Sequence, residues 1–362
     1  MLEFLRKQKK ILEIFGRLGG EAMAIDLGTA NLKIAILNKG IVIRQPSCVA
    51  LNKKTKQAVA FGQEAKEMIG KTPSQLEAIR PLKNGVIADF DATEAMLRHY
   101  LEKIKSPAER GGWGLILAKV SRPRVIIGIP SGVTEVERMA VQEVAVEAGA
   151  RQAFLIEQTL AAAIGAELPV MSSSGTMIVD VGGGTSEVAV VSLGGIVVNR
   201  SIRSAGDEMD EMIRRFCRLK YSLLLGPQSA EGVKISIGSA FPLNNKKEKH
   251  TVVRGRDLET GLPKSIRLGE SEIREAMAPV INSLIQAIRE VIEETPPELV
   301  GDVMEGAITL AGGGALLAGL PERIAKETKI PTMIADHPQE CVVKGAAKAL
   351  GKKELFERMV IR

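Results

Sequence analysis

The segment IVDVGGGTSEVAVV at positions 178–191 contains two apolar stretches, separated by an acidic residue, three glycines and two hydroxyl residues. An earlier segment, AIDLGTANLKIAIL at positions 24–37, repeats this arrangement, with Asp26 aligned on Asp180. Apolar stretches joined by a glycine-containing bend are typical of a β-hairpin. Because this hairpin occurs twice among alternating strands and helices, the sequence predicts an α/β architecture with two related domains facing one cleft.

The composition agrees with a folded chain of two domains. The protein has 362 residues, of which 45% are hydrophobic, and its formal net charge is only +6. Aromatic residues make up 3% of the chain, which leaves few platforms for base stacking, so nucleic acid is not the expected partner. Three widely separated cysteines, without a CxxC pair, favour a reducing compartment. The absence of a long apolar run and of a secretory signal predicts a cytoplasmic protein.

Several further elements are predicted from periodicity and from the residues that end helices. We expect a buried strand in RPRVIIGIP at 122–130, since its apolar run is continuous and is closed by proline. Proline and glycine breakers, together with helical periodicity, predict the main helices. These helices are expected at 93–105, 207–219, 228–237 and 271–294.

The first twenty residues form a segment of their own. On a helix at about 100° per residue, one face collects bulky apolar side chains and the opposite face is rich in lysine and arginine. This pattern predicts either a helix docked on the body of the protein or an amphipathic helix bound to an anionic membrane surface. The residues of the apolar face are Phe4, Leu5, Ile11, Leu12, Phe15 and Leu18.

A second apolar segment lies in RGGWGLILAKV at 110–120. It places Trp113 beside Leu115, Ile116 and Leu117 in a glycine-rich context, which is typical of an exposed loop that anchors at a membrane interface. The alternative is the start of a buried strand. Together with the terminal helix, this segment favours peripheral membrane binding.

The glycine turns predict a phosphate-binding site. A polyphosphate needs backbone N–H donors that no side chain obstructs, and Gly28 in the first turn and Gly182, Gly183 and Gly184 in the second provide that access. Thr29, Asn31, Thr185 and Ser186 add polar contacts. Asp26 and Asp180, each at the end of a strand, would contact Mg²⁺ through its water molecules, because magnesium gives up its hydration water reluctantly.

A third glycine turn, LAGGGALL at 310–317, again follows an apolar strand and offers bare backbone to a flat purine. One such turn alone could be a tight bend without a ligand, but three in one chain favour a nucleotide site. The sequence contains neither G-x-x-x-x-G-K-[ST] nor G-x-G-x-x-G, so it supports neither a P-loop nor a Rossmann site.

Taken in order and spacing, DLGTAN, DVGGGTSEVAV, AGDEMDE and LAGGGALL resemble the actin, heat-shock-70 and sugar-kinase superfamily, and within it the MreB family of bacterial actins. The resemblance runs from about residue 22 to residue 350 and includes IRPLKNGVIADF and PRVIIGIPSGVTEVER. It implies an actin-like ATPase fold with two RNase H-like domains around a nucleotide cleft, each with a smaller inserted subdomain. The implied parts are a membrane helix at 1–20, domain I at 21–170 with its insertion at 51–90, domain II at 171–340 with its insertion at 205–270, and a C-terminal helix at 341–362 that returns to domain I.

The resemblance also implies binding residues. The phosphate turns would include Thr29, Ala30, Asn31, Gly183, Gly184 and Thr185, and Gly206 belongs to the matching AGDEMDE motif. Glu231, Gly232, Val233 and Lys234 match the helix that contacts adenosine, and Gly312, Gly313, Gly314 and Ala315 match the turn on the base side.

Three positions depart from the family pattern. Gln158 stands where a glutamate is usual, Lys33 where the family is apolar, and Gly232 where arginine is usual. Eukaryotic actin has glutamine and lysine at the first two places, so the resemblance implies an actin-type site, whereas Gly232 is expected to loosen base binding. In this hypothesis Gln158 orients the attacking water, Asp180 orders magnesium and water, and Lys33 and Thr185 hold the phosphates.

By this resemblance, the expected function is that of a filament-forming bacterial actin with slow hydrolysis of ATP, or of GTP, with Mg²⁺. Its expected partners are other copies of itself in paired filaments, the anionic inner face of the cytoplasmic membrane, and the proteins of cell-wall elongation and cell shape. The alternatives are a sugar kinase and a chaperone-type ATPase. A sugar kinase requires a catalytic aspartate with a sugar pocket, and a chaperone requires a peptide-binding domain, and the sequence offers no clear candidate for either.

Overall fold

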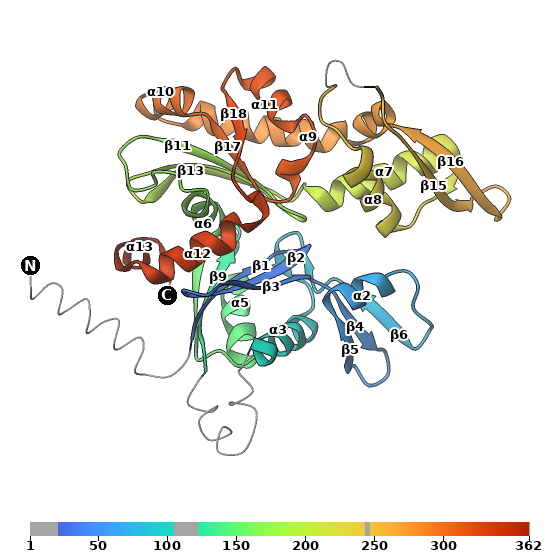
Figure 1. Cartoon of the computed structure of the whole chain (residues 1–362), viewed down its shortest axis with the longest axis horizontal. Coiled ribbons are helices and arrows are strands. Elements are labelled where there is room, and N and C mark those ends of the chain that lie inside the picture. The colour runs from blue at the N-terminus through green and yellow to red at the C-terminus, as the bar shows by residue number, and fades with distance from the viewer. Residues whose placement is uncertain (1–20, 105–121, 243–246, 362) are drawn as a thin grey trace, which may run out of the picture.

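Two five-stranded sheets with the same strand order organise the chain (Figure 1). The computed structural model describes residues 21–104, 122–242 and 247–361. The first sheet has the order β3-β2-β1-β9-β10 and the second the order β13-β12-β11-β17-β18. The strands of the first sheet are β1 (Ala22–Leu27), β2 (Asn31–Ile36), β3 (Gly40–Pro46), β9 (Arg124–Ile129) and β10 (Gln152–Glu157). Those of the second are β11 (Thr176–Val181), β12 (Ser186–Ser192), β13 (Gly195–Ile202), β17 (Ile308–Ala311) and β18 (Thr332–Ile334).

Strand pairing confirms the predicted duplication. In both sheets the first three strands are antiparallel. The fourth strand pairs in parallel with the first hairpin strand, and the fifth pairs in parallel with the fourth. Asp26 on β1 lies opposite Lys33 on β2, and Asp180 on β11 lies opposite Glu187 on β12. The central strands are buried almost throughout, as expected when helices cover both faces of a sheet.

Helices cover the two sheets. In the first half these are α3 (Phe90–Ile104) and α5 (Glu135–Glu147), and α5 begins at a capping box formed by Thr134 and Glu137. In the second half they are α9 (Glu270–Glu294), α10 (Pro297–Gly306) and α11 (Leu320–Thr328). The helices predicted at 93–105 and 271–294 are thus confirmed, with starts that differ by up to three residues.

Each half carries a smaller group of elements, and in Figure 1 the two groups lie on the same side of the molecule. The first contains β4 (Val49–Asn52), β5 (Ala58–Phe61), α2 (Gly62–Met68) and β6 (Leu76–Ile79), followed by the short hairpin of β7 (Leu82–Lys83) and β8 (Val86–Ile87). The second contains α7 (Gly206–Tyr221), β14 (Leu223–Leu224), α8 (Pro227–Ile237), β15 (His250–Asp257) and β16 (Pro263–Gly269).

Two small-residue helices join the halves. Helix α6 (Gln158–Gly165) leaves the first sheet, and α12 (Cys341–Gly351) follows the second and packs on both α6 and β1. Their backbones are so close that a Cβ atom on Gly345 would overlap the carbonyl of Ala161, and one on Gly165 would overlap the backbone of Cys341. Only glycine permits this crossing.

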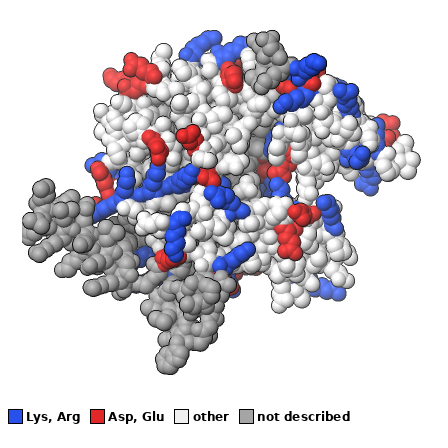
Figure 2. Space-filling view, in the orientation of Figure 1, with Lys and Arg blue, Asp and Glu red and all other residues white. Residues whose placement is uncertain are grey.

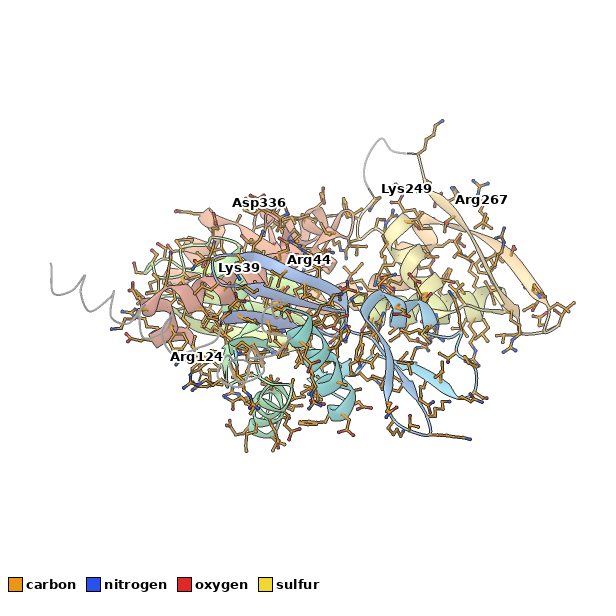
Figure 3. All side chains as sticks on the ribbon, turned by 60° about the horizontal axis from the view of Figure 1, so that its bottom comes forward. Lys39, Arg44, Arg124, Lys249, Arg267 and Asp336 are labelled. Carbon is orange, nitrogen blue, oxygen red and sulfur yellow. The ribbon has the colours of Figure 1, made fainter. Side chains whose placement is uncertain are left out.

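The chain end returns to the first sheet. After α13 (Lys353–Met359), Ile361 exchanges two backbone hydrogen bonds with Leu155 of β10, at N···O distances of 3.0 and 2.8 Å. On the opposite edge, Arg44 of β3 forms an ion pair with Glu340, just before α12, at 2.8 Å. Figure 3 shows Arg44 on this edge strand and Lys39 in the turn just before it. The last segment therefore ties the second half to the first.

Both predicted membrane segments, Phe4 to Leu18 and Trp113 to Leu117, lie outside the described residues. Within the ranges that are described, no helix is long and apolar enough to cross a bilayer.

Because α6 and α12 cross so closely, we expect position 345 not to tolerate a side chain. We expect Gly345→Ala to lower the free energy of unfolding by about 1–3 kcal/mol, because the added methyl forces two backbones apart. Gly301 of α10 is the matched control: it is also helical, but a Cβ atom there meets nothing within 4 Å. Gly301→Ala is therefore expected to leave stability unchanged or to raise it by up to about 1 kcal/mol. Urea unfolding followed by circular dichroism measures both, and equal midpoints for the two variants would contradict the packing argument.

Candidate functional site

A cavity of about 510 Å³ lies between the two halves, and both hairpin turns line it. Figure 2 shows this face of the molecule hollowed between its upper and lower parts, with acidic and basic side chains near the notch. The structure brings most of the predicted site residues together there. Those lining the cavity are Asp26, Gly28, Thr29, Ala30, Asn31, Lys33, Gln158, Asp180, Gly182, Gly183, Gly184, Thr185, Gly206, Glu231, Lys234, Gly312, Gly313 and Gly314.

Four residues that were expected in the site do not line the cavity. Ser186 on β12 is buried, and its hydroxyl donates to the carbonyl of Ser204 at 2.7 Å. Gly232 is exposed on α8, whereas Val233 and Ala315 point into the hydrophobic core of the second half. The reason for Val233 is helical geometry, since successive residues of a helix point about 100° apart and so cannot share one face. Matching a whole helical segment to a binding site therefore includes residues that face away from it.

The two glycine turns have equivalent internal hydrogen bonds. The N–H of Gly28 donates to the carbonyl of Asn31 at 3.2 Å, and the N–H of Gly182 donates to the carbonyl of Thr185 at 2.9 Å. The first glycine in each turn therefore closes the turn with its N–H. Donors for a phosphate must come from the residues that follow it.

The turns also contact each other across the cavity floor. A Cβ atom on Gly183 would lie 2.7 Å from the Cβ of Ala30, and one on Gly184 would lie 2.6 Å from the Oγ1 of Thr29. Thr29 in turn accepts a hydrogen bond from the N–H of Gly85 at 3.0 Å. The sequence suggested glycine here for access to phosphate, and the structure adds that glycine lets the two halves touch.

A pair of carboxylates and one lysine form the charged centre of the cavity. Lys33 forms an ion pair with Asp26 at 2.7 Å, and both side chains are nearly buried. Burial, together with the negative charge of Asp26, raises the pKa of Asp180 to about 7, although Lys33 acts in the opposite direction. Because a cation would favour the ionised form of Asp180, the centre is suited to a bound positive charge.

Gln158 lies at the first residue of α6 and lines the cavity with 7% of its surface exposed. Its amide nitrogen is 3.4 Å from the carbonyl oxygen of Gly128, at the end of β9. The preceding residue, Glu157, has a raised pKa, because burial outweighs the nearby charge of Arg138. A neutral amide and a half-buried acid are therefore consecutive residues where α6 begins.

Glu187 is a buried acid that sequence analysis missed. Its Oε1 accepts a hydrogen bond from the N–H of Ser131 at 2.7 Å, which joins β12 of the second half to the loop after β9 in the first. Burial, reinforced by Asp180, raises the pKa of Glu187 to about 8. Aligning the two hairpins would have identified Glu187 from the sequence, because Glu187 occupies the position in the second hairpin that Lys33 occupies in the first.

The second half contributes both a lysine and apolar side chains to the cavity, the latter from Met209, Ile235, Leu316 and Leu317. Lys234 reaches the cavity from α8, but its ammonium group donates to the carbonyl of Gly206 at 2.6 Å and pairs with Asp210 at 2.9 Å. Figure 3 shows Lys249 near the start of β15. Further lining residues that sequence analysis did not find are Leu27, Gly85, Asp207, Met209, Ile235, Ser236, Gly238, Lys249, Leu316, Leu317, Ala318, Pro338, Gln339 and Val342.

The raised pKa of Glu187 predicts a pH dependence of stability in the ligand-free protein. Between about pH 4.5 and 8 the unfolded chain releases this proton while the folded chain keeps it, so stability falls as pH rises. We expect Glu187→Gln, which has no proton to release, to lose less stability from pH 5 to pH 8, by about 2 °C or more in Tm. Glu322→Gln, at an exposed site on α11, is the control. Thermal scans in magnesium-free buffer measure the difference, and parallel pH curves for Glu187→Gln and the unmodified protein would refute it.

Comparison with known proteins gives one consistent assignment. The family model described as MreB/Mbl protein matches residues 20–358. The chain is 43% identical over 344 residues to the cell shape-determining protein MreB of Escherichia coli K12, covering 94% of this chain and 96% of that protein. It is 41% identical over 328 residues to the cell shape-determining protein Mbl of Bacillus subtilis 168, covering 91% and 95%.

The fold is also found in a solved structure. MreB5 of Spiroplasma citri bound to ADP superposes with a TM-score of 0.84 at 36% identity, over 93% of this chain and 97% of that one. The same protein is known bound to AMPPNP. These matches confirm both the predicted actin-like fold and the predicted family: the chain belongs to the MreB/Mbl family.

Proposed function

We propose that this protein binds ATP with Mg²⁺ in the cavity and polymerises into paired filaments at the inner face of the cytoplasmic membrane, where it organises cell-wall elongation and cell shape. The observation that carries the proposal is the pair of facing glycine turns, with Asp26 and Asp180 in the same cavity. Relatives in the family are named for cell shape determination, and the Spiroplasma relative has been solved with ADP and with AMPPNP.

The residues in the cavity fit a nucleoside triphosphate. Gly28 and Gly182 close their turns, so the backbone N–H groups after them are the candidate donors to phosphate oxygens. Glycine at 183 and 184 leaves the backbone bare on this side of the cavity. The turn at 312–314, which begins beside Asp180, and the apolar residues after it would receive the base. Glu231 lines the cavity from α8, and we expect its carboxylate to contact the ribose hydroxyls.

The carboxylates fit a hydrated magnesium ion. Within the described part of the chain, no group of three or more His, Cys, Asp and Glu residues is arranged to hold a metal directly. Two acids, Asp26 and Asp180, suit an ion that keeps most of its water and takes further oxygens from phosphate. When bound, magnesium would neutralise charge on the phosphates. Lys33, now paired with Asp26, is close enough to this centre to hold a phosphate oxygen as well.

Hydrolysis in this proposal depends on Gln158. Its side chain enters the cavity from the start of α6, and a neutral amide can orient a water molecule but is a poor general base. Thr185 lines the cavity from the second turn, where its hydroxyl would hold the phosphates. Turnover is therefore expected to be slow and to depend on how closely the two halves approach.

Membrane attachment is proposed from the sequence of the first twenty residues and of the apolar segment around Trp113. Bulky apolar residues opposite a lysine- and arginine-rich face suit an anionic lipid surface. This part of the proposal can fail without affecting the nucleotide site.

Electron microscopy with vesicles tests the filament and membrane proposals together. We expect paired filaments on anionic vesicles with ATP and Mg²⁺, and none without nucleotide. A chain that starts at Glu21 should still polymerise but should bind lipid more weakly, because it keeps only the apolar segment around Trp113. Neutral vesicles are the control for the charge requirement. Dispersed single molecules under every condition would contradict the filament proposal, and sugars would then be screened for phosphorylation.

Removing the water-orienting amide tests the role of Gln158. We expect Gln158→Ala to slow ATP hydrolysis by about tenfold to a hundredfold, with little change in nucleotide affinity, since the side chain would act on the attacking water and not on bound phosphate. Gln286→Ala, at an exposed position of α9, is the matched control. Phosphate release from filaments measures the rate. An unchanged rate in Gln158→Ala would show that another group orients the water.

A further inference from the structure

Ion pairs connect the two smaller groups of elements across the mouth of the cavity. Lys66 on α2 pairs with Glu231 on α8 at 2.8 Å. Arg80, just after β6, pairs with Asp207 on α7 at 2.7 Å and lies 3.9 Å from Glu231. The side-chain amide of Gln228 also donates a hydrogen bond to the backbone carbonyl of Lys66. One cluster thus contains Lys66, Arg80, Asp207 and Glu231. Its ion pairs join residues that are more than 120 positions apart in the sequence.

The two acids of this cluster also belong to the wall of the cavity. Asp207 and Glu231 line the cavity, whereas Lys66 and Arg80 stand behind them and do not line it. Each acid therefore faces the cavity on one side and a cation of the opposite half on the other. Any molecule in the cavity that contacts Glu231 contacts a carboxylate whose position Lys66 and Arg80 determine.

The cluster is charged and partly shielded from water. The four side chains have exposed fractions between 22% and 34%, which is intermediate between surface and core. Burial by itself would raise the pKa of Glu231, but the hydrogen bond and charge of Lys66 lower it below its ordinary value. Glu231 is therefore ionised at neutral pH, and the pair with Lys66 is a true ion pair.

The two basic residues of the cluster lie on or next to regular secondary structure of the first half. Lys66 projects from helix α2, and Arg80 follows strand β6 and precedes Pro81, whose carbonyl accepts hydrogen bonds from the N–H groups of Ala88 and Asp89 at 2.9 and 3.0 Å. Cys48, fully buried under the same cluster, lies against the guanidinium group of Arg80. The cations are thus fixed to the first half, so separating the halves at the mouth must break the ion pairs.

We propose that Lys66 and Arg80 are positioning residues for the nucleotide, and that with Glu231 and Asp207 they form a cross-cavity clamp that sets the rate at which bound nucleotide leaves. This inference rests on the proposed binding of ATP. We expect the clamp to act on release and not on the orientation of the attacking water, because neither Lys66 nor Arg80 lines the cavity.

Nucleotide dissociation measured by stopped flow tests the clamp. Full-length protein is loaded with a fluorescent ATP analogue and Mg²⁺ and then mixed with excess unlabelled ATP, under conditions that keep it unpolymerised. We expect Arg80→Ala and Lys66→Ala each to release the analogue about threefold to tenfold faster than the unmodified protein. Arg289→Ala, which removes an ion pair with Glu327 inside the second half, is the matched control and should leave the rate unchanged.

Charge-reversed variants distinguish a role in positioning the nucleotide from a general effect on the stability of the protein. Arg80→Asp and Asp207→Arg should each accelerate release, and the double variant, which restores an opposite-charge pair across the mouth, should recover a rate within about threefold of the original. Thermal unfolding of every variant without nucleotide shows whether it is folded. Release at the original rate from both alanine variants, or no recovery in a folded double variant, would overturn the clamp. If the unmodified protein bound no ATP, the proposed function itself would be wrong.

Discussion

The close approach of two backbones is the constraint on which the rest of this structure depends. Within the described residues, it occurs where the turns around Ala30 and Gly183 touch and where α6 crosses α12 at Gly345. Each place needs residues without side chains, because a single Cβ atom would push the halves apart. The cavity exists in its present form because these contacts set the separation of the two sheets.

This constraint explains how two equivalent hairpins, one in each half, form a single site. Two equivalent turns meet almost face to face, so the acids at the ends of their strands reach one cavity. The equivalence does not extend to charge. The position opposite Asp26 holds Lys33, whereas the position opposite Asp180 holds Glu187. The first hairpin thus neutralises its own acid, and the second adds another acid whose hydrogen bond to Ser131 returns to the first half.

The halves are held together differently at the two ends of the cavity. At its base the contacts are backbone and small side chains, which tolerate little displacement. At its mouth they are ion pairs of Lys66 and Arg80 with the acids of α7 and α8, which can break and re-form at moderate cost. The contacts at the base are therefore close-packed, whereas those at the mouth are polar and partly exposed to water.

Much of this protein follows from local sequence patterns. The two hairpins, their acids and glycine turns, the long helix α9 and the small-residue helices all depend on interactions between near neighbours, and periodicity and turn residues report these directly. The prediction of a phosphate site likewise came from the glycine turns themselves and from their recurrence along the chain. Only the tertiary structure decided which side chains meet. It paired Lys33 with Asp26, turned Val233 into the core, joined Glu187 to Ser131 and placed Arg80 against Asp207, because such contacts link residues distant in the chain whose directions depend on how the two halves pack.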